Sequence, residues 1–201
     1  MGRDKLLSSL RSRISDERVL AAIAAVPRSQ FVDPEMASAA YVDMPLRIGG
    51  GQTISQPTIV ARMCEALQPQ PSDRVLDIGT GSGYHAAVLA RLCAHVWGIE
   101  LDPQLAMRAA RSLARAGIDN VTVLTGDGSL GVPEQAPFDA INVAATAREE
   151  IPPALEAQLA PGGRLVVPVA RGRYEHLVLV RREGDEFERR LLERVRFVPL
   201  R

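Results

Sequence analysis

The feature that most constrains the fold of this chain is a regular alternation between strand-like and helical segments. Short apolar runs are separated by segments in which apolar residues recur at helical spacing. The predicted strands are Arg74–Ile78, His95–Ile99, Val121–Thr125, Phe138–Val143 and Arg164–Val169. The predicted helical segments are Gly83–Cys93, Pro103–Ala116, a short turn near Ser129–Gly131, and Pro152–Leu159. Strands separated by helices predict a parallel sheet that is covered on both faces.

The flanks of this region carry different patterns. The first forty residues are helical in pattern, and one helix is predicted to start at the capping sequence Ser15-Asp16-Glu17. Residues 41–53 are glycine-rich and are predicted to be irregular, whereas Gln56–Leu67 is predicted to be helical. Near the end of the chain, His176–Arg182 and Arg190–Val198 are predicted to form a hairpin. The whole pattern predicts an α/β fold with a Rossmann-like, mostly parallel doubly wound sheet, an antiparallel edge and an N-terminal helical cap.

The composition limits the possible classes of protein. With 201 residues, 46% of them hydrophobic, the chain is long enough to bury one substantial core. Its 24 basic residues balance its 24 acidic residues, so the net charge does not indicate binding to nucleic acid or to an anionic membrane. The first residues lack an apolar stretch long enough for a signal peptide or a membrane span. Cys64 and Cys93 are expected to be buried free thiols, so we predict a cytoplasmic protein without a disulfide or a metal site.

The sharpest motif joins the first predicted strand to the following helix. It reads Val75-Leu76-Asp77-Ile78-Gly79-Thr80-Gly81-Ser82-Gly83-Tyr84. Three glycines at a strand-to-helix turn permit torsions and close ligand contact that a Cβ would hinder. A dinucleotide site would need its third glycine at the position of Tyr84, and Asp77 would repel a pyrophosphate. The same carboxylate can bind the ammonium group of a methionine-like cofactor, directly or through water, so the motif favours such a cofactor over a nicotinamide.

Acidic residues also follow the next two predicted strands. Glu100 closes the second strand, where a carboxylate can accept hydrogen bonds from both ribose hydroxyls. Asp127, between Gly126 and Gly128, closes the third strand, and a short side chain there suits contact with an adenine amino group. The carboxyl ends of successive parallel strands meet at one edge of the sheet, where nucleotide-like ligands bind. The three sites together predict an adenosine-containing cofactor.

Further segments extend the pattern over nearly the whole chain. They are Val26-Pro27-Arg28, Phe31-Val32, Ala40-Tyr41 with Asp43, Gly51-Gln52-Thr53-Ile54-Ser55-Gln56-Pro57, Val60-Ala61-Arg62-Met63, Pro137-Phe138-Asp139-Ala140-Ile141, Pro152-Pro153-Ala154-Leu155, Pro161-Gly162-Gly163 and Arg196-Phe197-Val198-Pro199-Leu200. With these segments and the glycine motif, the sequence resembles the protein-L-isoaspartate O-methyltransferase family. The resemblance implies the fold of a class I methyltransferase and S-adenosyl-L-methionine as the cofactor.

The resemblance also implies a reaction and a site. It implies methylation of the α-carboxylate of L-isoaspartyl residues in damaged proteins, a repair reaction, with Ser55 as the catalytic residue. The expected cofactor-binding residues are Ile54, Ser55, Gln56, Pro57, Asp77, Gly79, Thr80, Gly81, Gly83, Glu100, Leu101, Asp127 and Gly128. We expect one methyltransferase domain, in which residues 1–55 are the helical cap and active-site lead-in and residues 56–201 the cofactor-binding core. The expected partners are isoaspartyl proteins or peptides, with no nucleic acid and no membrane, and the expected state is a monomer.

The chemistry of this reaction agrees with the residues available. A carboxylate with a reference pKa of ~3.5 is ionised at neutral pH, so its attack on a methyl group needs no general base. Methyl transfer needs in-line positioning and removal of water, and the Ser55 hydroxyl is expected to orient the attacking oxygen. The three histidines are scattered along the chain and are expected to be structural or exposed; they are His85, His95 and His176.

Three places depart from the usual family sequence. Arg47 stands where the family has proline, and the loop Val143–Arg148, preceded by Asn142, is read as one residue longer than usual. Glu175 stands at a position where glutamine is common, and it either points inward, where it would repel an anionic substrate, or is a surface acid. Two alternatives therefore stay open. The chain could be a carboxyl methyltransferase that acts on a specific peptide aspartate to form a succinimide or aspartimide, or a cofactor-binding relative with weakened catalysis.

Overall fold

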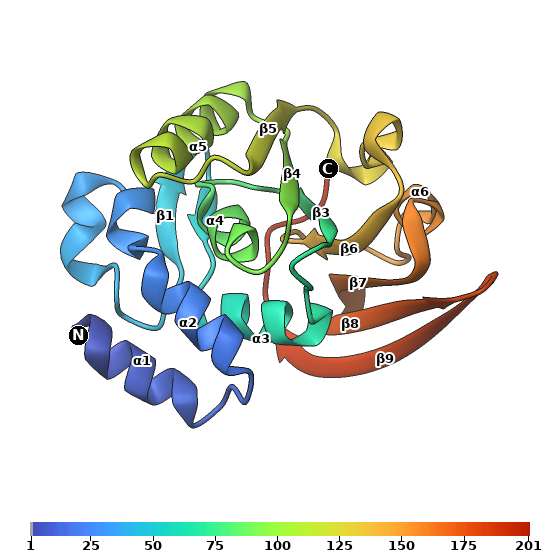
Figure 1. Cartoon of the computed structure of the whole chain (residues 1–201), viewed down its shortest axis with the longest axis horizontal. Coiled ribbons are helices and arrows are strands. Elements are labelled where there is room, and N and C mark those ends of the chain that lie inside the picture. The colour runs from blue at the N-terminus through green and yellow to red at the C-terminus, as the bar shows by residue number, and fades with distance from the viewer. Residues whose placement is uncertain (1) are drawn as a thin grey trace.

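The central element is a sheet of seven strands, seen in a computed structural model that describes residues 2–201 (Figure 1). In spatial order the strands are β5 (Val121–Thr125), β4 (His95–Glu100), β3 (Arg74–Ile78), β6 (Phe138–Val143), β7 (Leu159–Arg171), β8 (Tyr174–Glu183) and β9 (Glu186–Val195). The strands from β5 to β7 are parallel, and β8 and β9 continue the sheet in antiparallel pairing. The order of the strands along the chain reverses at β3, beside which ligands bind in open α/β sheets. The predicted doubly wound sheet with an antiparallel edge is confirmed.

Two apolar layers cover the sheet because successive side chains of a strand point to opposite faces. In β3, Val75 packs into the first layer and Leu76 into the second, and both are buried. The first layer is covered by helices α3 (Pro57–Leu67), α4 (Tyr84–Ala90) and α5 (Pro103–Arg115). The second is covered by α6 (Pro153–Ala157) and the neighbouring 3-10 turns η3 (Gly128–Leu130) and η4 (Pro133–Gln135). The helices therefore lie on both faces, as predicted.

The N-terminal residues form helices that pack on the first layer (Figure 1). They are α1 (Arg3–Arg11), α2 (Glu17–Ala25) and the 3-10 turns η1 (Arg28–Phe31) and η2 (Pro34–Ala39). As predicted, α2 begins at a capping residue: the carboxylate of Asp16 accepts a hydrogen bond from the backbone N of Arg18 at 2.8 Å. The apolar side of α2 joins the same buried cluster as α3 and α4, so the N-terminal helices and the sheet share one apolar layer.

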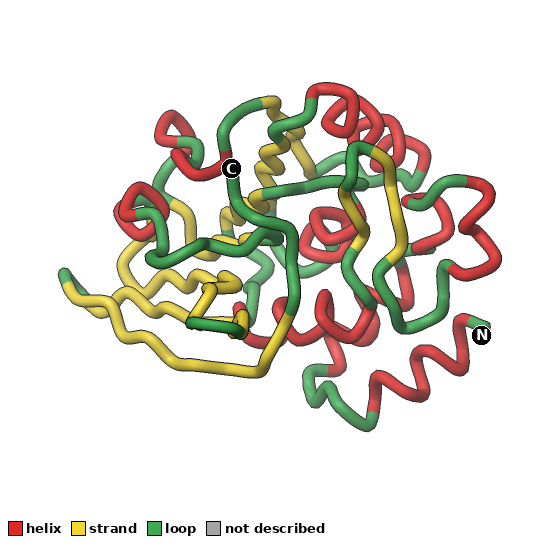
Figure 2. Tube along the Cα trace, turned by 180° about the vertical axis from the view of Figure 1, so that it is seen from behind, coloured by secondary structure: helices red, strands yellow, loops and turns green. Residues whose placement is uncertain are grey.

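The prediction that residues 41–53 are irregular is wrong. Strands β1 (Leu46–Gly49) and β2 (Gln52–Ile54) pair in a separate antiparallel hairpin (Figure 2). Gly49, Gly50 and Gly51 form the turn, and all three have positive φ. Residues with a Cβ rarely adopt this backbone conformation. The strands are too short for their alternation of buried and exposed residues to stand out beside three glycines. The hairpin delivers the following residue, Ser55, to the edge of the main sheet.

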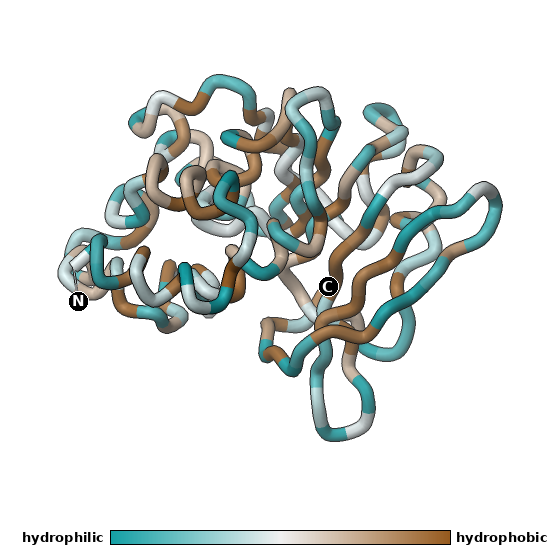
Figure 3. The backbone as a smooth tube through the Cα atoms, turned by 60° about the horizontal axis from the view of Figure 1, so that its bottom comes forward, coloured by the Kyte–Doolittle hydropathy of each residue, from teal (hydrophilic) through white to brown (hydrophobic). Residues whose placement is uncertain are grey.

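The last predicted strand, Arg190–Val198, exists and pairs as a hairpin, but its predicted bounds are wrong. β9 begins at Glu186 and ends at Val195, so residues 196–198 leave the sheet and run back over the molecule as a loop (Figure 2). They leave because their backbone pairs with the loop after β6. Hydrophilic residues gather toward the tip of the hairpin of β8 and β9, whereas the middle of β8 is hydrophobic and buried (Figure 3). Among residues 2–201, no helix is long and apolar enough to cross a membrane.

Candidate active site

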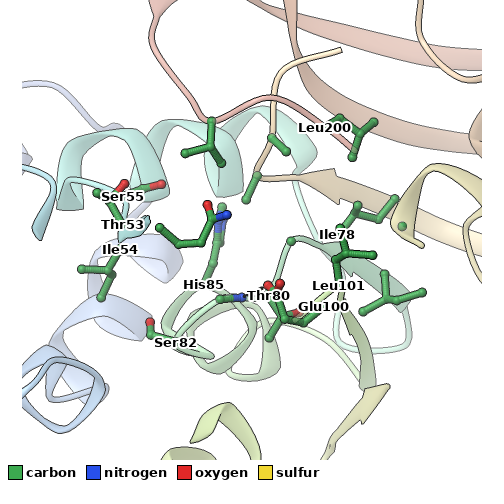
Figure 4. A pocket seen from close by; sticks show the side chains of 18 of the residues that line it. Thr53, Ile54, Ser55, Ile78, Thr80, Ser82, His85, Glu100, Leu101 and Leu200 are labelled. Atoms are coloured by element: carbon green, nitrogen blue, oxygen red, sulfur yellow. Dashed lines mark hydrogen bonds between the residues drawn. The ribbon is translucent and has the colours of Figure 1, made fainter. Parts of the chain in front are cut away.

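A pocket opens at the carboxyl ends of β3, β4 and β6, at the place that the strand order indicates (Figure 4). Its wall includes many of the residues predicted from sequence: Ile54, Ser55, Gly79, Thr80, Gly81, Glu100, Leu101 and Gly128. It also includes residues that were not predicted: Gln52, Thr53, Val60, Ile78, Ser82, Tyr84, His85, Ile99, Ala144, Ala145, Val198, Pro199, Leu200 and Arg201. The fold therefore brings the residue after the β1–β2 hairpin, the glycine turn and the end of the chain together around one cavity.

The glycine turn is held by hydrogen bonds from its own backbone. The amides of Gly79 and Thr80 donate to the carbonyl of Ile99 at 2.9 and 3.2 Å. The amide of Gly81 donates to Glu100 Oε2 at 2.8 Å, and Glu100 Oε1 accepts from the backbone N of Asp102 at 3.0 Å. The carboxylate predicted to bind the ribose is thus fixed in place by the same turn that carries the glycines.

Asp77 lies beneath this turn and does not line the pocket. It is inaccessible to solvent, and Asn142 Nδ2 donates to its Oδ1 at 2.7 Å while the Thr80 hydroxyl lies 3.0 Å from its Oδ2. Burial raises the pKa of Asp77 to about 6, although the hydrogen bonds from Asn142 and Thr80 oppose that shift. Asn142 stands opposite Asp77 in the register of β6 and β3, which explains why this polar residue lies inside a buried strand. At neutral pH Asp77 is mostly ionised and can attract an ammonium group.

His85 extends the same buried network. Its Nδ1 lies 3.1 Å from Asn142 Nδ2, and its Nε2 lies 3.5 Å from the sulfur of Cys64. Burial lowers the pKa of His85 to about 3, so the ring is neutral at pH 7. A neutral ring that accepts from Asn142 has the structural role expected for this histidine, although its position in the pocket wall was not predicted.

The remaining predicted cofactor residues lie outside this pocket. Gln56 lines a neighbouring groove, Pro57 opens α3, and the exposed Asp127 caps η3 by accepting from the backbone N of Ser129 at 2.9 Å. Gly83 has φ +87°, and a Cβ there would approach α5 to 3.3 Å, so it allows α4 and α5 to pack closely. The structure does not bring these four residues into the pocket wall.

Ser55 is held in position by a buried arginine. Arg28 Nη2 donates to the carbonyl oxygen of Ser55 at 3.0 Å and to that of Met44 at 3.1 Å, and Nη1 donates to that of Ala40 at 2.5 Å. Arg28 is only 1% exposed, its burial lowers its pKa, and its guanidinium lies 5.8 Å from the ring centre of Tyr84. One side chain thus ties together three separate backbone segments. Nothing local in the sequence marks this role, because the three acceptors lie 12 to 27 residues along the chain.

A second cavity of about 330 Å³ adjoins the pocket and forms a groove. Ser55, Thr53, Ala144 and Val198 line both cavities. Ser55 therefore stands at the junction between the pocket that holds the glycine turn and the groove beside it. A group bound in the groove would meet a group bound in the pocket at this residue.

The end of the chain covers both cavities, and we call residues 196–201 the C-terminal strap. The backbone of Thr146 pairs with it: Thr146 N donates to the carbonyl of Val198 at 2.8 Å, and Leu200 N donates to the carbonyl of Thr146 at 2.9 Å. Glu175 Oε2 accepts from the Thr146 hydroxyl and from the backbone N of Phe197, both at 2.7 Å. Glu175 lines neither cavity. It is neither an inward repelling charge nor a free surface acid, because its carboxylate clamps the strap.

In residues 2–201, no cluster of three or more His, Cys, Asp or Glu side chains has an arrangement that could hold a metal ion. Cys64 and Cys93 are both buried and unpaired with each other, as predicted.

Comparison with known proteins gives the same family throughout. A sequence model of the protein-L-isoaspartate(D-aspartate) O-methyltransferase family matches residues 1–201. The chain is 51% identical over 194 residues to a protein-L-isoaspartate O-methyltransferase of Koribacter versatilis, an alignment that covers 96% of this chain and 87% of that one. Relatives at this level of identity are numerous.

Two solved structures share the fold over almost the whole chain. A structure named protein-L-isoaspartate O-methyltransferase has a TM-score of 0.88 and 32% identity; the match covers 98% of this chain and 65% of that longer chain. A structure of a putative enzyme of the same name from Plasmodium falciparum, in complex with S-adenosyl-L-homocysteine, has a TM-score of 0.86 and 27% identity, with 100% and 99% covered. Fold, glycine turn and sequence agree, and this chain belongs to the protein-L-isoaspartate(D-aspartate) O-methyltransferase family.

Proposed function

We propose that this protein transfers a methyl group from S-adenosyl-L-methionine to the α-carboxylate of L-isoaspartyl residues in damaged proteins. The observation that carries the proposal is the position of Ser55 at the junction of two cavities. One cavity contains the glycine turn and Glu100, and the other is an open groove of a size suited to a peptide segment. The solved relative in complex with S-adenosyl-L-homocysteine, the demethylated form of this cofactor, supports the assignment of the first cavity.

The residues of the first cavity fit such a cofactor. At Gly81, which lines the cavity, a Cβ would approach Ile48 Cδ1 to 3.2 Å on the side away from it, so the glycine lets the turn pack tightly against β1. Glu100 offers carboxylate oxygens for ribose hydroxyls, Asp77 supplies negative charge beneath the turn, and Asn142 Oδ1 is buried without a hydrogen-bond partner. We propose a cofactor site whose wall includes Ile54, Ser55, Gly79, Thr80, Gly81, Glu100, Leu101 and Gly128. Gln56, Pro57, Asp77, Gly83 and Asp127 belong to the proposed site as residues that lie around or beneath this wall. When bound, the cofactor supplies an electrophilic methyl group.

The protein's own part in the reaction is to position the acceptor carboxylate and to exclude water from it. The acceptor carboxylate is ionised at neutral pH, so no residue has to remove a proton from it. The Ser55 hydroxyl can donate to one carboxylate oxygen and leave the other free to attack in line. Arg28 fixes the backbone of Ser55, and the C-terminal strap covers the junction from the other side. A backbone amide nitrogen would then attack the ester carbonyl of the product without the enzyme, closing a succinimide and releasing methanol, and hydrolysis of the ring would return part of it to aspartate.

Several broader assignments belong to the same proposal. We propose one domain divided into residues 1–55, the cap and active-site lead-in, and residues 56–201, the cofactor-binding core. The partners are isoaspartyl proteins or peptides, and neither nucleic acid nor a membrane takes part. The balanced charge of the chain supports the absence of a nucleic-acid or membrane partner. The protein acts as a monomer in the cytoplasm.

The test is transfer of labelled methyl to two peptides that differ only in an aspartyl or an isoaspartyl linkage. We expect transfer to the isoaspartyl peptide alone. Transfer to neither peptide, despite cofactor binding, would favour a weakened relative, and transfer to the aspartyl peptide would favour an enzyme that acts on a specific aspartate.

Ser55→Ala tests the catalytic assignment. We expect turnover on the isoaspartyl peptide to fall about tenfold or more, because an interaction made mainly in the transition state appears in kcat. Cofactor affinity, measured by calorimetry, should fall by a smaller factor than turnover does. Ser72→Ala, in an exposed turn, is the matched control and should keep full activity. Full activity of Ser55→Ala would refute the assignment.

A further inference from the structure

A third cavity, a cleft of about 630 Å³ between helix α5 and residues 29–34, is lined by a row of arginines and takes no part in the proposed reaction. We propose that this cleft binds a small ligand with two or more linked phosphate groups. The arginines are Arg108, Arg111 and Arg115, all on α5. The inference does not rest on the proposed function, because it concerns neither the cofactor pocket nor the groove beside Ser55.

Two of the arginines reach across the cleft from α5 to the N-terminal part of the chain. Arg108 Nη1 donates to the carbonyl of Ile48 at 2.9 Å, and its Nη2 donates to the carboxylate of Asp33. Arg115 Nη2 donates to the carbonyl of Gln30 at 3.4 Å. Ile48, Asp33 and Gln30 all line the cleft, so the guanidinium groups of both arginines lie at its wall.

Arg111 lies between these two arginines on the same face of α5. Residues three and four apart on a helix are neighbours on its surface, and Arg111 is three residues from Arg108 and four from Arg115. Its side chain is exposed, and the hydrogen bond that it makes within residues 2–201 is to the sulfur of Met107 at 3.4 Å, a weak acceptor. The guanidinium of Arg111 is therefore free to turn toward an anion in the cleft.

The cleft has a surplus of positive charge. Among residues 2–201, its wall includes three arginines and a single acid, Asp33, which is already paired with Arg108. Within the same part of the chain, Arg115 donates to a carbonyl and a hydroxyl through Nη2 alone, so its Nη1 and Nε remain available as donors. Neither Arg111 nor Arg115 forms an ion pair with any described residue. Two guanidinium charges are thus left over in a chain whose net charge is zero.

The spacing of the arginines indicates the class of ligand. Seven residues of an α-helix span about 10 Å, so the row from Arg108 to Arg115 is longer than one phosphate group. A guanidinium binds phosphate oxygens through two parallel hydrogen bonds. Two linked phosphate groups can therefore meet Arg111 and Arg115 together, whereas a single phosphate cannot span both. Phe31 and Leu105 form an apolar wall beside the row, which can contact an organic group attached to the phosphates.

The cleft is distinct from the cofactor pocket, although the two cavities share Gly81 and Ser82. A Cβ at Gly81 would approach Ile48, which lines the cleft and not the pocket, so one side of the glycine turn faces the cleft. Glu100 lines the pocket and Asp77 lies beneath it, and both carboxylates repel an anion. A phosphate ligand is therefore expected in the cleft and not in the pocket.

The experiment titrates the full chain with inorganic pyrophosphate by calorimetry, in a phosphate-free buffer of low ionic strength. We expect saturable binding of one ion per chain with a Kd below about 1 mM, and a Kd at least about fivefold higher in about 0.3 M salt, because salt screens exposed charges. At equal ionic strength, orthophosphate should bind at least about fivefold more weakly than pyrophosphate. Absence of saturable binding up to about 10 mM pyrophosphate, or equal affinities for the two ions, would overturn the proposal.

Variants test whether the ion binds in the cleft. Arg111→Gln and Arg115→Gln each remove one unpaired charge, and each should weaken pyrophosphate binding at least about fivefold. Both side chains are exposed, so both variants should fold. Arg91→Gln is the matched control, since Arg91 is an exposed arginine outside the cleft, and it should bind pyrophosphate as the wild type does. Unchanged affinity in both Arg111→Gln and Arg115→Gln would overturn the assignment to the cleft.

ADP distinguishes two sources of linked phosphate groups, a nucleotide and an inorganic polyphosphate. Tighter binding of ADP than of pyrophosphate, weakened to the same extent by Arg115→Gln, would identify a nucleotide. Equal or weaker binding of ADP would identify the inorganic ion. Adenosine is the control for entry of ADP into the cofactor pocket, because it lacks the phosphate groups that the arginines would bind. Methyl transfer is not part of any of these measurements, so their outcome is independent of the proposed function.

Discussion

The two sides of the candidate active site are built in different ways. On the cofactor side, the glycine turn is held by hydrogen bonds to Ile99 and Glu100, which lie on the adjacent strand some twenty residues further along the chain. On the acceptor side, Ser55 and the C-terminal strap are held by Arg28, Thr146 and Glu175, which come from three distant parts of the chain. A short motif thus shapes the first side, whereas long-range polar contacts assemble the second.

This difference predicts how each side will fail. Changes in the glycine turn should weaken cofactor binding more than they weaken the fold, because the turn's neighbours are rigid strand ends. Changes in the residues that hold the acceptor side should loosen Ser55 or the strap. Such changes should lower the free energy of unfolding or raise KM for the isoaspartyl peptide.

The largest expected effect is on Arg28. Arg28→Met leaves one buried and two partly buried carbonyl groups without their donor, so we expect the free energy of unfolding to fall by about 3–5 kcal/mol. Urea denaturation measures this free energy of unfolding. Arg18→Met is the matched control: Arg18 is an exposed arginine of the same N-terminal region, paired with Asp16, and its loss should cost less than about 1 kcal/mol. If Arg28→Met does not fold, Arg28→Lys, which keeps the charge and loses the fork of donors, takes its place. A loss below about 1 kcal/mol for Arg28→Met would show that Arg28 does not hold the acceptor side.

The next effect concerns the glycine turn. Valine at position 81 would have to adopt a φ of +55°, and its Cβ would crowd Ile48, which lies outside the pocket wall, so the turn that forms that wall would have to shift. We expect Gly81→Val to weaken cofactor binding at least about 100-fold, or ~3 kcal/mol, in a protein that still folds. Gly117→Val is the matched control, because Gly117 also has a positive φ, +65°, and so imposes the same torsional strain on valine. The space around Gly117 is open, so this variant should bind the cofactor normally. Equal binding by both variants would remove the turn from the cofactor site.

The pH dependence of cofactor binding tests the charge beneath the turn. Burial holds the pKa of Asp77 at about 6, so its negative charge is present at pH 7 and is lost as the pH falls through 6. Calorimetry should therefore show affinity falling below pH 6, by up to about tenfold for each unit. Asp77→Asn should bind about tenfold more weakly at pH 7 and lose this dependence. A wild-type affinity that stays constant from pH 7 to pH 5 would contradict the role of Asp77.

In the cofactor-free protein, Asp77 makes folding stability depend on pH in the opposite direction from cofactor affinity. Because folding raises the pKa of Asp77 above its ordinary value of 3.8, this group favours the fold at low pH, and that contribution is lost as the pH rises through about 6. Comparing urea unfolding of wild type and Asp77→Asn at pH 5 and pH 7 isolates the contribution. Between pH 5 and pH 7, the free energy of unfolding of the wild type should fall relative to that of Asp77→Asn.

The smallest effect is expected at Glu175. Glu175→Gln keeps an oxygen that can accept from Thr146 and Phe197, so the KM for isoaspartyl peptide should change by less than about twofold. Glu175→Ala removes the acceptor and frees the strap, and KM should rise about three- to tenfold, or roughly 1 kcal/mol. A KM that falls in Glu175→Gln, with a gain that shrinks at high salt, would show instead that the carboxylate faces the substrate.

The parts of the fold that were predicted correctly are those with a strong local signal. β3, β5 and β6 have the predicted bounds. β3 and β6 are buried parallel strands, which are mostly apolar runs between turn residues, and the edge strand β5 ends at the turn signal Gly126-Asp127-Gly128. The β1–β2 hairpin was missed because its glycines resemble an irregular loop. The predicted strand Arg190–Val198 includes the first three residues of the strap, because their alternating apolar residues fit a strand. Thr146 and Glu175, which hold these residues away from the sheet, are distant along the chain.

By itself the sequence determined the doubly wound sheet, the glycine turn at its carboxyl edge and the family. These depend on periodicity and on short motifs, which act through neighbouring residues. Only the tertiary structure decided that Asp77 lies beneath the pocket, that Arg28 holds Ser55, and that Glu175 clamps the strap. The physical reason is that burial and polar pairing are set by whatever residue the fold brings alongside, and a side chain's own sequence neighbours do not contain that information.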